Sequence, residues 1–353
     1  MYKWIVIAVL AVFFFIVTGP ESETYDSAHF SKGRFHNDAP DSISATQIIP
    51  KVFKMAFDYK KLMPQTPPPA AKISGEYFSS STHGRLNVTW VSHACALIKY
   101  NDIKVITDPV FSERASFTQF FGPKRFEQIQ PLEETETGPI DVVIISHNHY
   151  DHLDEKAVLS LKDRTKFFVV SLGVGKYLKH WGVDPARIIE LDWGASFMTD
   201  GLTITAAPAQ HMSKRGLFDR NKSFWSSFVI QPGPYKVFFS GDTGYIPDFR
   251  KLGAMYGHFD IAMLDIGAYN KAWKQNHMTP EEAVQAGIDL RANAVMPIHW
   301  GTFQLSDFVW TEPIERFTKE ASLRGLRYTV PIQGEPVDPD VMLPKDRWWL
   351  TVR

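Results

Sequence analysis

The sequence predicts an α/β fold in which two mixed sheets are flanked by helices. From Gly138 onward, short apolar runs typical of buried strands alternate with polar stretches that favour helices. Several of these runs end in histidine or aspartate, and open α/β sheets carry their chemistry at the carboxyl ends of their strands. The order of these residues fits two ββα-type halves that meet at about residues 194–201.

The composition is that of an ordinary globular enzyme. The chain has 353 residues, of which 44% are hydrophobic and 22% charged, so it can bury one large core or two fused halves. A formal net charge of −1 gives no basic excess, and we expect no nucleic-acid partner. Cys95 is the only cysteine, which excludes an intrachain disulfide.

Residues 1–20 predict a membrane anchor or a signal segment. Trp4 to Val17 is uninterrupted apolar sequence, and no small-residue cleavage site follows it. An uncleaved single anchor is favoured over a cleaved signal peptide. The lone preceding charge, Lys3, would keep the N-terminus cytoplasmic and place the catalytic domain on the other side of the membrane, which is the periplasm if the source is bacterial.

Residues 21–85 predict a linker and N-terminal extension before a catalytic domain at 86–353. The proline-rich sequence from Met63 to Ala71 is typical of an extended linker. Residues 51–63 interleave apolar residues with lysines, so an amphipathic helix could lie on anionic lipid or pack on the domain.

The domain opens with strand-like segments at Val88–Tyr100 and Ile103–Thr107. His93 lies in the first, where a core histidine is favoured over one that faces an active-site cleft. The following stretch, Phe111–Phe126, alternates aromatic with basic residues. It predicts either an acyl-chain groove with a phosphate approach or plain core packing, and the sequence leaves both open.

The most informative segment is His147–His152, which reads HNHYDH after a strand-like apolar run. Three imidazoles and a carboxylate are metal-ligand chemistry, and alternate side chains of an extended loop point the same way. His147 and His149 can therefore bind one ion while Asp151 and His152 turn toward a second. Neither pair completes a tetrahedral shell, so further ligands must come from other strand ends.

Three later strand-like segments supply such residues. Each is short and apolar, and beyond their ends lie His211, Asp242 in the sequence GDTG, and His299. A single buried histidine is more often part of a core. The convergence of four strand ends on the same chemistry favours a metal site.

These motifs resemble the metallo-β-lactamase superfamily, and more closely the N-acylphosphatidylethanolamine-hydrolysing phospholipase D family. The resemblance covers about Asn87 to Ser306 and rests on WVSHA, TDPVFSERAS, FGPKRF, ISHNHYDHLD, QHMSKR, FSGDTGY, IGAY, HMTPEEAV and IHWGTF. It implies an αββα sandwich that contains one catalytic domain with a dizinc site. The N-terminal anchor departs from the animal enzymes of the family, so this chain resembles a bacterial-type homologue.

The resemblance also implies roles for individual residues. One zinc would be held by His147, His149 and His211, and the other by Asp151, His152 and His299, with Asp242 bridging both. Asp108 would be a further carboxylate that orients a ligand histidine. Zinc is favoured over a redox pair of irons, because the related diiron flavoproteins carry glutamate where this chain has His149.

Asp151, Asp242 and His277 are the candidate catalytic residues. His277 lies in the family-like HMTPEEAV, where it would protonate the leaving group or orient the phosphate, although a structural role beside the helix cap is the alternative. The sequence from Thr279 reads as a capping box that predicts a helix from Pro280 to about Arg291. A last helix is predicted at Thr311–Leu323.

Six further residues are candidate substrate contacts. The basic ones would meet phosphate or be solvated, and the aromatic ones would line an apolar groove or belong to the core. They are Lys124, Arg125, Lys214, Arg215, Tyr269 and Trp225.

The sequence therefore predicts a membrane-attached dizinc phosphodiesterase that hydrolyses N-acylphosphatidylethanolamine or a related glycerophospholipid by direct water attack. No G-x-S-x-G motif supplies a serine nucleophile. A metallo-lactonase or other ester hydrolase is the alternative, and a non-catalytic lipid-binding protein is less favoured. The expected partners are membrane phospholipid and the membrane surface, with a homodimer as an option.

Overall fold

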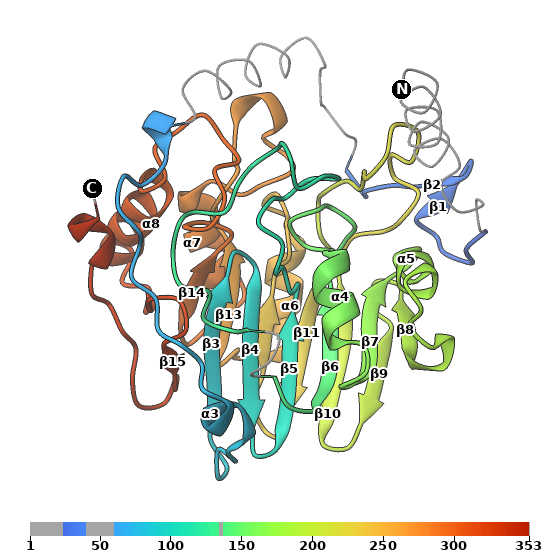
Figure 1. Cartoon of the computed structure of the whole chain (residues 1–353), viewed down its shortest axis with the longest axis horizontal. Helices are drawn as coiled ribbons and strands as arrows, with labels where there is room; N and C mark the ends of the chain where they lie inside the picture. Colours follow the sequence, from blue (N-terminus) through green and yellow to red (C-terminus); the bar gives the residue numbers. More distant parts are fainter. Residues whose placement is uncertain (1–23, 40–59, 134–136, 353) are drawn as a thin grey trace, which may run out of the picture.

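The computed structural model describes residues 24–39, 60–133 and 137–352, and in these ranges two sheets are flanked by helices (Figure 1). The predicted α/β fold with two mixed sheets is confirmed. The first sheet contains, in spatial order, β15 (Pro336–Val337), β3 (Leu86–Ser92), β4 (Cys95–Tyr100), β5 (Ile103–Thr107), β6 (Ile140–Ile145), β7 (Thr165–Ser171) and β8 (Ile188–Leu191). The second contains β14 (Val295–Ile298), β13 (Ile261–Asp265), β12 (Val237–Phe239), β11 (Ser227–Pro232), β10 (Leu202–Ala207) and β9 (Ser196–Thr199).

The main core lies between the sheets. Val142 and Ile144 of β6 belong to the same buried cluster as Phe228 of β11 and Phe239 of β12. A second cluster covers the other face of the first sheet, where Val143 packs with residues of α4 (Glu155–Leu161) and α5 (Gly175–His180). Because both faces of β6 are buried, its sequence is continuously apolar rather than alternating.

Helices α6 (Asp248–Tyr256), α7 (Pro280–Asp289) and α8 (Glu312–Leu323) lie on the second sheet, and their apolar residues join the main core. The capping box at the start of α7 is present, since the Thr279 hydroxyl and the Glu282 side chain each accept from the other's backbone N–H. Both predicted helices are confirmed to within two residues at each end. Further helical segments of the described residues are α3 (Gly75–Ser79) and the 3-10 turns at Pro185–Arg187, Lys271–Trp273 and Trp348–Thr351.

Strand direction brings distant parts of the chain to one edge. β5, β6 and β7 are parallel, and so are β12, β13 and β14. The carboxyl ends of these strands therefore meet at the upper edge in Figure 1. The loops that leave this edge contain every predicted ligand.

The N-terminal extension differs from the linker that the sequence predicts. Residues 24–39 include a small hairpin of β1 (Phe30–Ser31) and β2 (Arg34–Phe35), and Phe35 is fully buried against Phe224 with ring centroids 4.9 Å apart. We call residues 24–39 the N-terminal arm. The predicted anchor at 1–20 and most of the predicted helix at 51–63 lie outside the described residues. Within the described ranges, no helix is both long and apolar enough to cross a bilayer.

Candidate metal centre

The seven predicted ligands lie together at the carboxyl edge of the two sheets. His147, His149, Asp151 and His152 follow β6, and His211, Asp242 and His299 follow β10, β12 and β14. Their side chains form two neighbouring groups, each compact enough to surround a single ion. Most of these side chains are at most 2% exposed, whereas 13% of the Asp151 side chain reaches solvent.

The first group consists of His147, His149, His211 and Asp242. Nδ1 of His149 lies 2.8 Å from Nε2 of His147 and 3.2 Å from Nε2 of His211. Oδ2 of Asp242 is 3.7 Å from Nε2 of both His147 and His211. Three imidazole nitrogens and one carboxylate oxygen therefore converge on one point.

The second group contains Asp151, His152 and His299, together with His93. Oδ2 of Asp151 lies 3.6 Å from Nε2 of His152 and 3.4 Å from Nε2 of His299. The other oxygen of Asp242, Oδ1, lies 3.1 Å and 3.2 Å from the same two nitrogens. Asp242 thus presents one oxygen to each group, which is the geometry of a bridging carboxylate.

The distances within both groups suit a metal ion. Two donors about 2.0–2.1 Å from a tetrahedral zinc lie about 3.3 Å from one another, which is close to the separations seen here. Nε2 of His152, Nε2 of His299 and Oδ1 of Asp242 are buried without a hydrogen-bond partner. Buried polar atoms without a partner are costly, so their convergence indicates a site that a cation would complete.

The protonation of the two groups differs. Burial lowers the pKa of His147 and His211 well below the usual value and that of His149 to about 4, so these imidazoles are neutral and carry a lone pair for a metal. Burial alone would lower the pKa of His152 and His299 too, but the carboxylates around them, of which Asp242 has the largest effect, together outweigh burial and raise the pKa of both well above the usual value. Without a metal, these two imidazoles hold protons where a cation would bind.

Asp108, at the end of β5, orients the β6 loop. Its Oδ2 accepts from Nδ1 of His152 and from the Ser146 hydroxyl, both at 2.6 Å, and its Oδ1 accepts from the Ser146 backbone N–H at 2.7 Å. This leaves Nε2 of His152 directed at Asp242. The contact is the one the resemblance implies for Asp108.

Asp265 has a corresponding position on the second sheet, and the sequence analysis missed it. It is fully buried at the end of β13, where Oδ2 lies 2.9 Å from Nδ1 of His277 and Oδ1 lies 3.3 Å from Nδ1 of His299. One carboxylate therefore holds the predicted acid through a hydrogen bond and lies within ion-pair distance of a predicted ligand. A signal was available, because Asp265 ends an apolar strand just before the IGAY motif.

His93 is buried as predicted, but it is not an isolated core residue. Its Nε2 lies 3.0 Å from Oδ2 of Asp151, which places it within the second group. The backbone bulge of β3 between Trp90 and Ser92 and the left-handed conformation of His93, with φ of 43°, turn the side chain toward the site. The preference for a core histidine remote from the cleft is therefore corrected.

His277 lies at the exposed side of the centre. Its ring packs 5.1 Å from that of His211 and 5.3 Å from that of His299, and its Nδ1 is 4.0 Å from Oδ2 of Asp242. The side chain is 11% exposed, so solvent reaches the centre here as well as at Asp151 and at the partly exposed His149. Because Asp265 accepts the proton on Nδ1, the tautomer is fixed and Nε2 is free to act toward a substrate.

The structure gives Arg215 and Trp225 supporting contacts. Arg215 donates to the backbone carbonyls of Asn148 and Leu153, at 3.1 and 2.7 Å, and so braces the HNHYDH loop from behind. Trp225 is buried and donates from Nε1 to Asn37 and to the carbonyl of Ala209. Both side chains are occupied by the protein itself, so as substrate contacts they are corrected to residues that hold the ligand loops.

The other candidate contacts are distributed differently. Arg125 is buried and donates to the carbonyls of Val110 and Ser112, which corrects it to a loop-supporting residue. Tyr269 is held by Glu312 of α8 through a 2.9 Å hydrogen bond, so its hydroxyl is turned away from the metal groups. Lys214 is exposed, and Lys124 is half-exposed beside Glu127 at 3.9 Å.

The N-terminal arm contributes a contact that no residue pattern predicts. Asn37 donates from its side-chain amide to the carbonyl of His211 at 2.8 Å, and its Oδ1 accepts from the His211 backbone N–H at 3.2 Å. The same oxygen accepts from Nε1 of Trp225 at 2.8 Å. Asn37 therefore clamps the backbone of a predicted metal ligand from a segment outside the sandwich.

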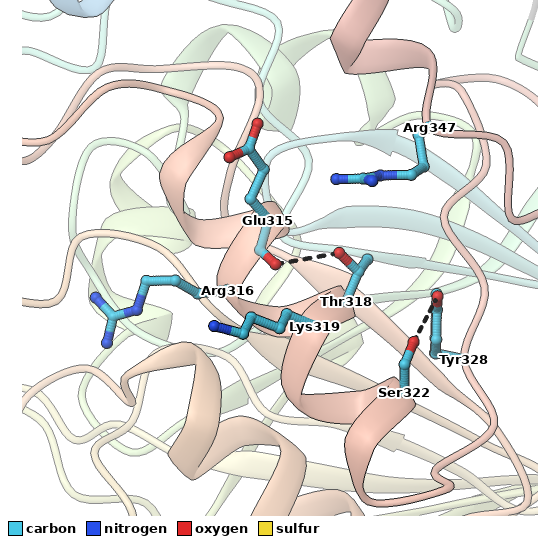
Figure 2. A pocket seen from close by; sticks show the side chains of 7 residues that line it. All are labelled: Glu315, Arg316, Thr318, Lys319, Ser322, Tyr328 and Arg347. Carbon is cyan, nitrogen blue, oxygen red and sulfur yellow. Dashed lines mark hydrogen bonds between the residues drawn. The ribbon is translucent and has the colours of Figure 1, made fainter.

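Two surface hollows lie away from these residues. One, of about 520 Å³, lies over α8 between Glu315 and Arg347, with Thr318, Ser322 and Tyr328 on its floor (Figure 2). The other, of about 530 Å³, is lined by Lys72, Phe111, Ile129 and neighbouring residues. Neither is lined by a residue of the two groups.

Comparison with known proteins agrees with this geometry. Residues 104–300 match the family described as the Beta-lactamase superfamily domain. An uncharacterised protein of Mycobacterium tuberculosis is 42% identical over 269 residues, which cover 75% of this chain and 72% of that protein. The N-acyl-phosphatidylethanolamine-hydrolyzing phospholipase D 1 of Caenorhabditis elegans is 39% identical over 259 residues, which cover 70% of this chain and 71% of that enzyme.

A solved structure shows the same fold. The metallo hydrolase Igni18 from Ignicoccus hospitalis superposes with a TM-score of 0.54 at 23% identity, covering 71% of this chain and 97% of that one. The matched family, the sandwich and the histidine and aspartate groups lead to one conclusion. The chain belongs to the metallo-β-lactamase superfamily as a metal-dependent hydrolase, and N-acyl-phosphatidylethanolamine-hydrolysing phospholipases D are among its relatives.

Proposed function

We propose that the protein is a dizinc phosphodiesterase of the phospholipase D type. The observation that carries the proposal is Asp242, whose two oxygens each face a different group of imidazoles at 3.1–3.7 Å. Nitrogen-rich groups that share one carboxylate favour a pair of zinc ions. The names of the Caenorhabditis elegans and Saccharomyces cerevisiae relatives, 39% and 35% identical, support a glycerophospholipid substrate.

The reaction is hydrolysis of the phosphodiester on the headgroup side. When bound, paired zinc supplies Lewis acidity that activates a water and offsets the charge of the phosphate oxygens. The water oxygen bonds to phosphorus, the bond from phosphorus to the headgroup oxygen breaks, and the leaving oxygen takes a proton. N-acylphosphatidylethanolamine or a related lipid then yields phosphatidic acid and an N-acylethanolamine or free amino-alcohol.

The chain's own residues supply the proton and the positioning. Nε2 of His277 would donate a proton to the leaving oxygen, and Asp265 holds the ring in position through its hydrogen bond with Nδ1. Asp151 is fixed by His93, so its carboxylate keeps one orientation during the reaction. No serine or cysteine nucleophile is required, because water attacks directly.

The test uses the full, zinc-loaded chain in detergent with N-acylphosphatidylethanolamine in heavy-oxygen water. One labelled oxygen is expected in phosphatidic acid, as read by mass spectrometry, and the Asp242→Ala variant should form no product. Unlabelled phosphatidic acid would contradict attack at phosphorus. Turnover of lactone or carboxylic ester substrates with none of phosphodiesters would instead support the ester hydrolase alternative.

A further inference from the structure

The exposed phenylalanines of the described residues are confined to two loops. Phe117, Phe120 and Phe121 are 58%, 91% and 58% exposed, and Phe218 is 63% exposed beside Leu217 at 56%. None of the other large apolar side chains exposed in the same ranges is aromatic. Contiguous exposed aromatic residues are unusual on a protein that contacts only water and indicate an interaction surface.

The first loop is a hairpin closed by hydrogen bonds, and its aromatic residues face outward. The backbone N–H of Ala115 donates to the carbonyl of Pro123 at 3.0 Å. The guanidinium of Arg114 donates to the carbonyls of Gln119 and Gly122 at 3.1 and 2.7 Å, which closes the tip. Residues 117–123 read FTQFFGP and carry no charge. We call residues 113–124 the aromatic hairpin.

These exposures resolve the two interpretations that the sequence left open for Phe111–Phe126. Phe111 and Phe126, at the ends of the stretch, are 3% and 2% exposed and pack in the core. The central phenylalanines do not. Core packing is therefore correct for the ends of the stretch and wrong for its centre.

The second loop is a tight turn stabilised by one carboxylate. Asp219 accepts from the backbone N–H groups of Arg215 and Gly216, at 3.1 and 2.7 Å. Leu217 and Phe218 lie between these donors and Asp219. They are uncharged and project to solvent. We call residues 215–219 the Phe218 turn.

Both loops are hydrogen-bonded to segments that carry predicted ligands. The aromatic hairpin continues into Phe126, whose backbone N–H donates to the carbonyl of Thr302, three residues beyond His299. The Phe218 turn begins after Lys214, whose backbone N–H donates to Asn148 of the HNHYDH segment. Both loops rise from the edge that carries the centre (Figure 1). The exposed aromatic residues thus belong to loops on the same edge as the metal centre.

The N-terminal arm ties this same edge to the apolar sequence at the start of the chain. Arg34 donates to the carbonyl of Arg220 at 2.7 Å, and the backbone N–H of Phe35 donates to the carbonyl of Asn221 at 2.7 Å. These contacts lie beside the Phe218 turn. Only residues 18–23 separate the apolar run ending at Val17 from the arm, and a chain of that length spans at most about 25 Å.

From these observations we infer that the edge bearing the metal centre faces a phospholipid bilayer, with the tips of the aromatic hairpin and the Phe218 turn in its interface. The two tips are apolar and uncharged, which suits the boundary between headgroups and acyl chains, where aromatic side chains are favoured. An apolar run held in a membrane would keep the arm, and with it this edge, close to the bilayer. The inference deepens the proposed function, since it gives the lipid a path to the site, but it is testable without turnover.

The test places an environment-sensitive fluorophore at the hairpin tip. The full chain carrying Phe120→Cys is labelled, which the buried native Cys95 permits, and reconstituted in vesicles of phosphatidylcholine and phosphatidylethanolamine. We expect a blue shift and quenching by lipids with a spin label near the headgroup. The matched control is Asp102→Cys, an exposed position in the β4–β5 turn at the opposite edge, where neither change is expected.

A water-like spectrum at position 120 in vesicle-bound protein overturns the inference, and so does equal quenching at both positions. A second experiment replaces Phe120 and Phe121 by serine. We expect the rate on vesicle substrate to fall about tenfold while the rate on a dispersed short-chain phosphodiester is unchanged. Equal loss on both substrates contradicts the inference. Absence of turnover in the unmodified protein counts against the proposed function alone, because the quenching result does not depend on catalysis.

Discussion

Asp265 and His277 lie 2.9 Å apart, from the carboxylate Oδ2 to Nδ1, and the second oxygen of the same carboxylate lies 3.3 Å from Nδ1 of His299. A carboxylate has two oxygens, so it can offer one hydrogen-bond acceptor to each imidazole. A carboxamide has only one oxygen, and its other group is a donor. Asp265→Asn would present an amide N–H to one of the two Nδ1–H groups and so reverse one tautomer. We expect kcat to fall about 10- to 100-fold with little change in KM.

The measurement is steady-state kinetics combined with zinc content. If Asp265 had only a structural role, the variant would give less folded protein, but the folded fraction would not show a lower kcat at an unchanged KM. A folded Asp265→Asn variant with full zinc and normal kcat would contradict the positioning role of Asp265.

Removal of the shared carboxylate should disrupt both groups at once. Asp242→Ala leaves Nε2 of His152 and Nε2 of His299 without the oxygen that lies 3.1 and 3.2 Å away. We expect bound zinc to fall below two ions per chain and phosphodiesterase activity to be lost. Metal analysis by plasma mass spectrometry checks this. Asp248→Ala, at the start of α6, is the matched control and should keep both ions.

Zinc binding to the metal-free protein should release protons at pH 7. Burial opposes the charged form of His152 and His299, but the surrounding carboxylates, with Asp242 the strongest, together raise the pKa of both well above the usual value, so both imidazoles carry protons that a cation must displace. Calorimetric titrations in buffers of different ionisation enthalpy measure the number released. We expect one to two protons per chain, and a binding heat that does not vary with the buffer would contradict this.

The metal-free protein should lose stability on acidification between about pH 6.5 and 4. Burial lowers the pKa of His149 to about 4 and that of His93 to about 3, so the unfolded chain binds protons in this range that the folded chain does not. Each such histidine contributes up to about 1.4 kcal/mol per pH unit, and this stability is lost as the pH falls. His152 and His299 act oppositely, since their contribution is complete below pH 6.5 and is lost as the pH rises through their raised pKa values. Urea unfolding with a chelator present should therefore show a stability maximum near neutral pH.

The clamp at Asn37 should affect metal retention more than folding. Asn37→Ala leaves the backbone N–H and carbonyl of His211 without their partners, which costs about 1–3 kcal/mol for buried groups. We expect faster zinc loss to a chelator with an unchanged circular dichroism spectrum. Asn37→Asp keeps the acceptor for the N–H groups of His211 and Trp225, so its rate of zinc loss should be intermediate.

The strand-end pattern identified the candidate ligands in the sequence, and the family resemblance implied the sandwich and the division of the seven residues between two ions. A buried parallel strand such as β6 is continuously apolar, and its carboxyl end carries the polar side chains. The local backbone geometry could not be predicted from the sequence. His93 reaches Asp151 only because of a bulge and a positive φ, and neither leaves a pattern in residue type.

Residues that act through a single long-range contact were also misjudged. Arg215 and Trp225 are the right residue types for a substrate site, but their partners are backbone groups whose positions depend on the whole fold. The N-terminal arm has no strand or helix periodicity, so nothing in its sequence marked it as part of the domain. Asp265 differs from these cases, since the strand-end pattern that identified Asp242 applies to it equally.

The Asn37 contact also bears on how the protein matures. Asn37 and His211 are 174 positions apart, so during synthesis the arm emerges long before the loop it must hold. Both sheets and all seven donor side chains can assemble before that contact closes, and docking of the arm would then be the late step that separates a folded chain from one able to retain its metal. A unit for expression or proteolytic mapping must therefore include Asn37, which lies 67 residues before residue 104, where the family match starts.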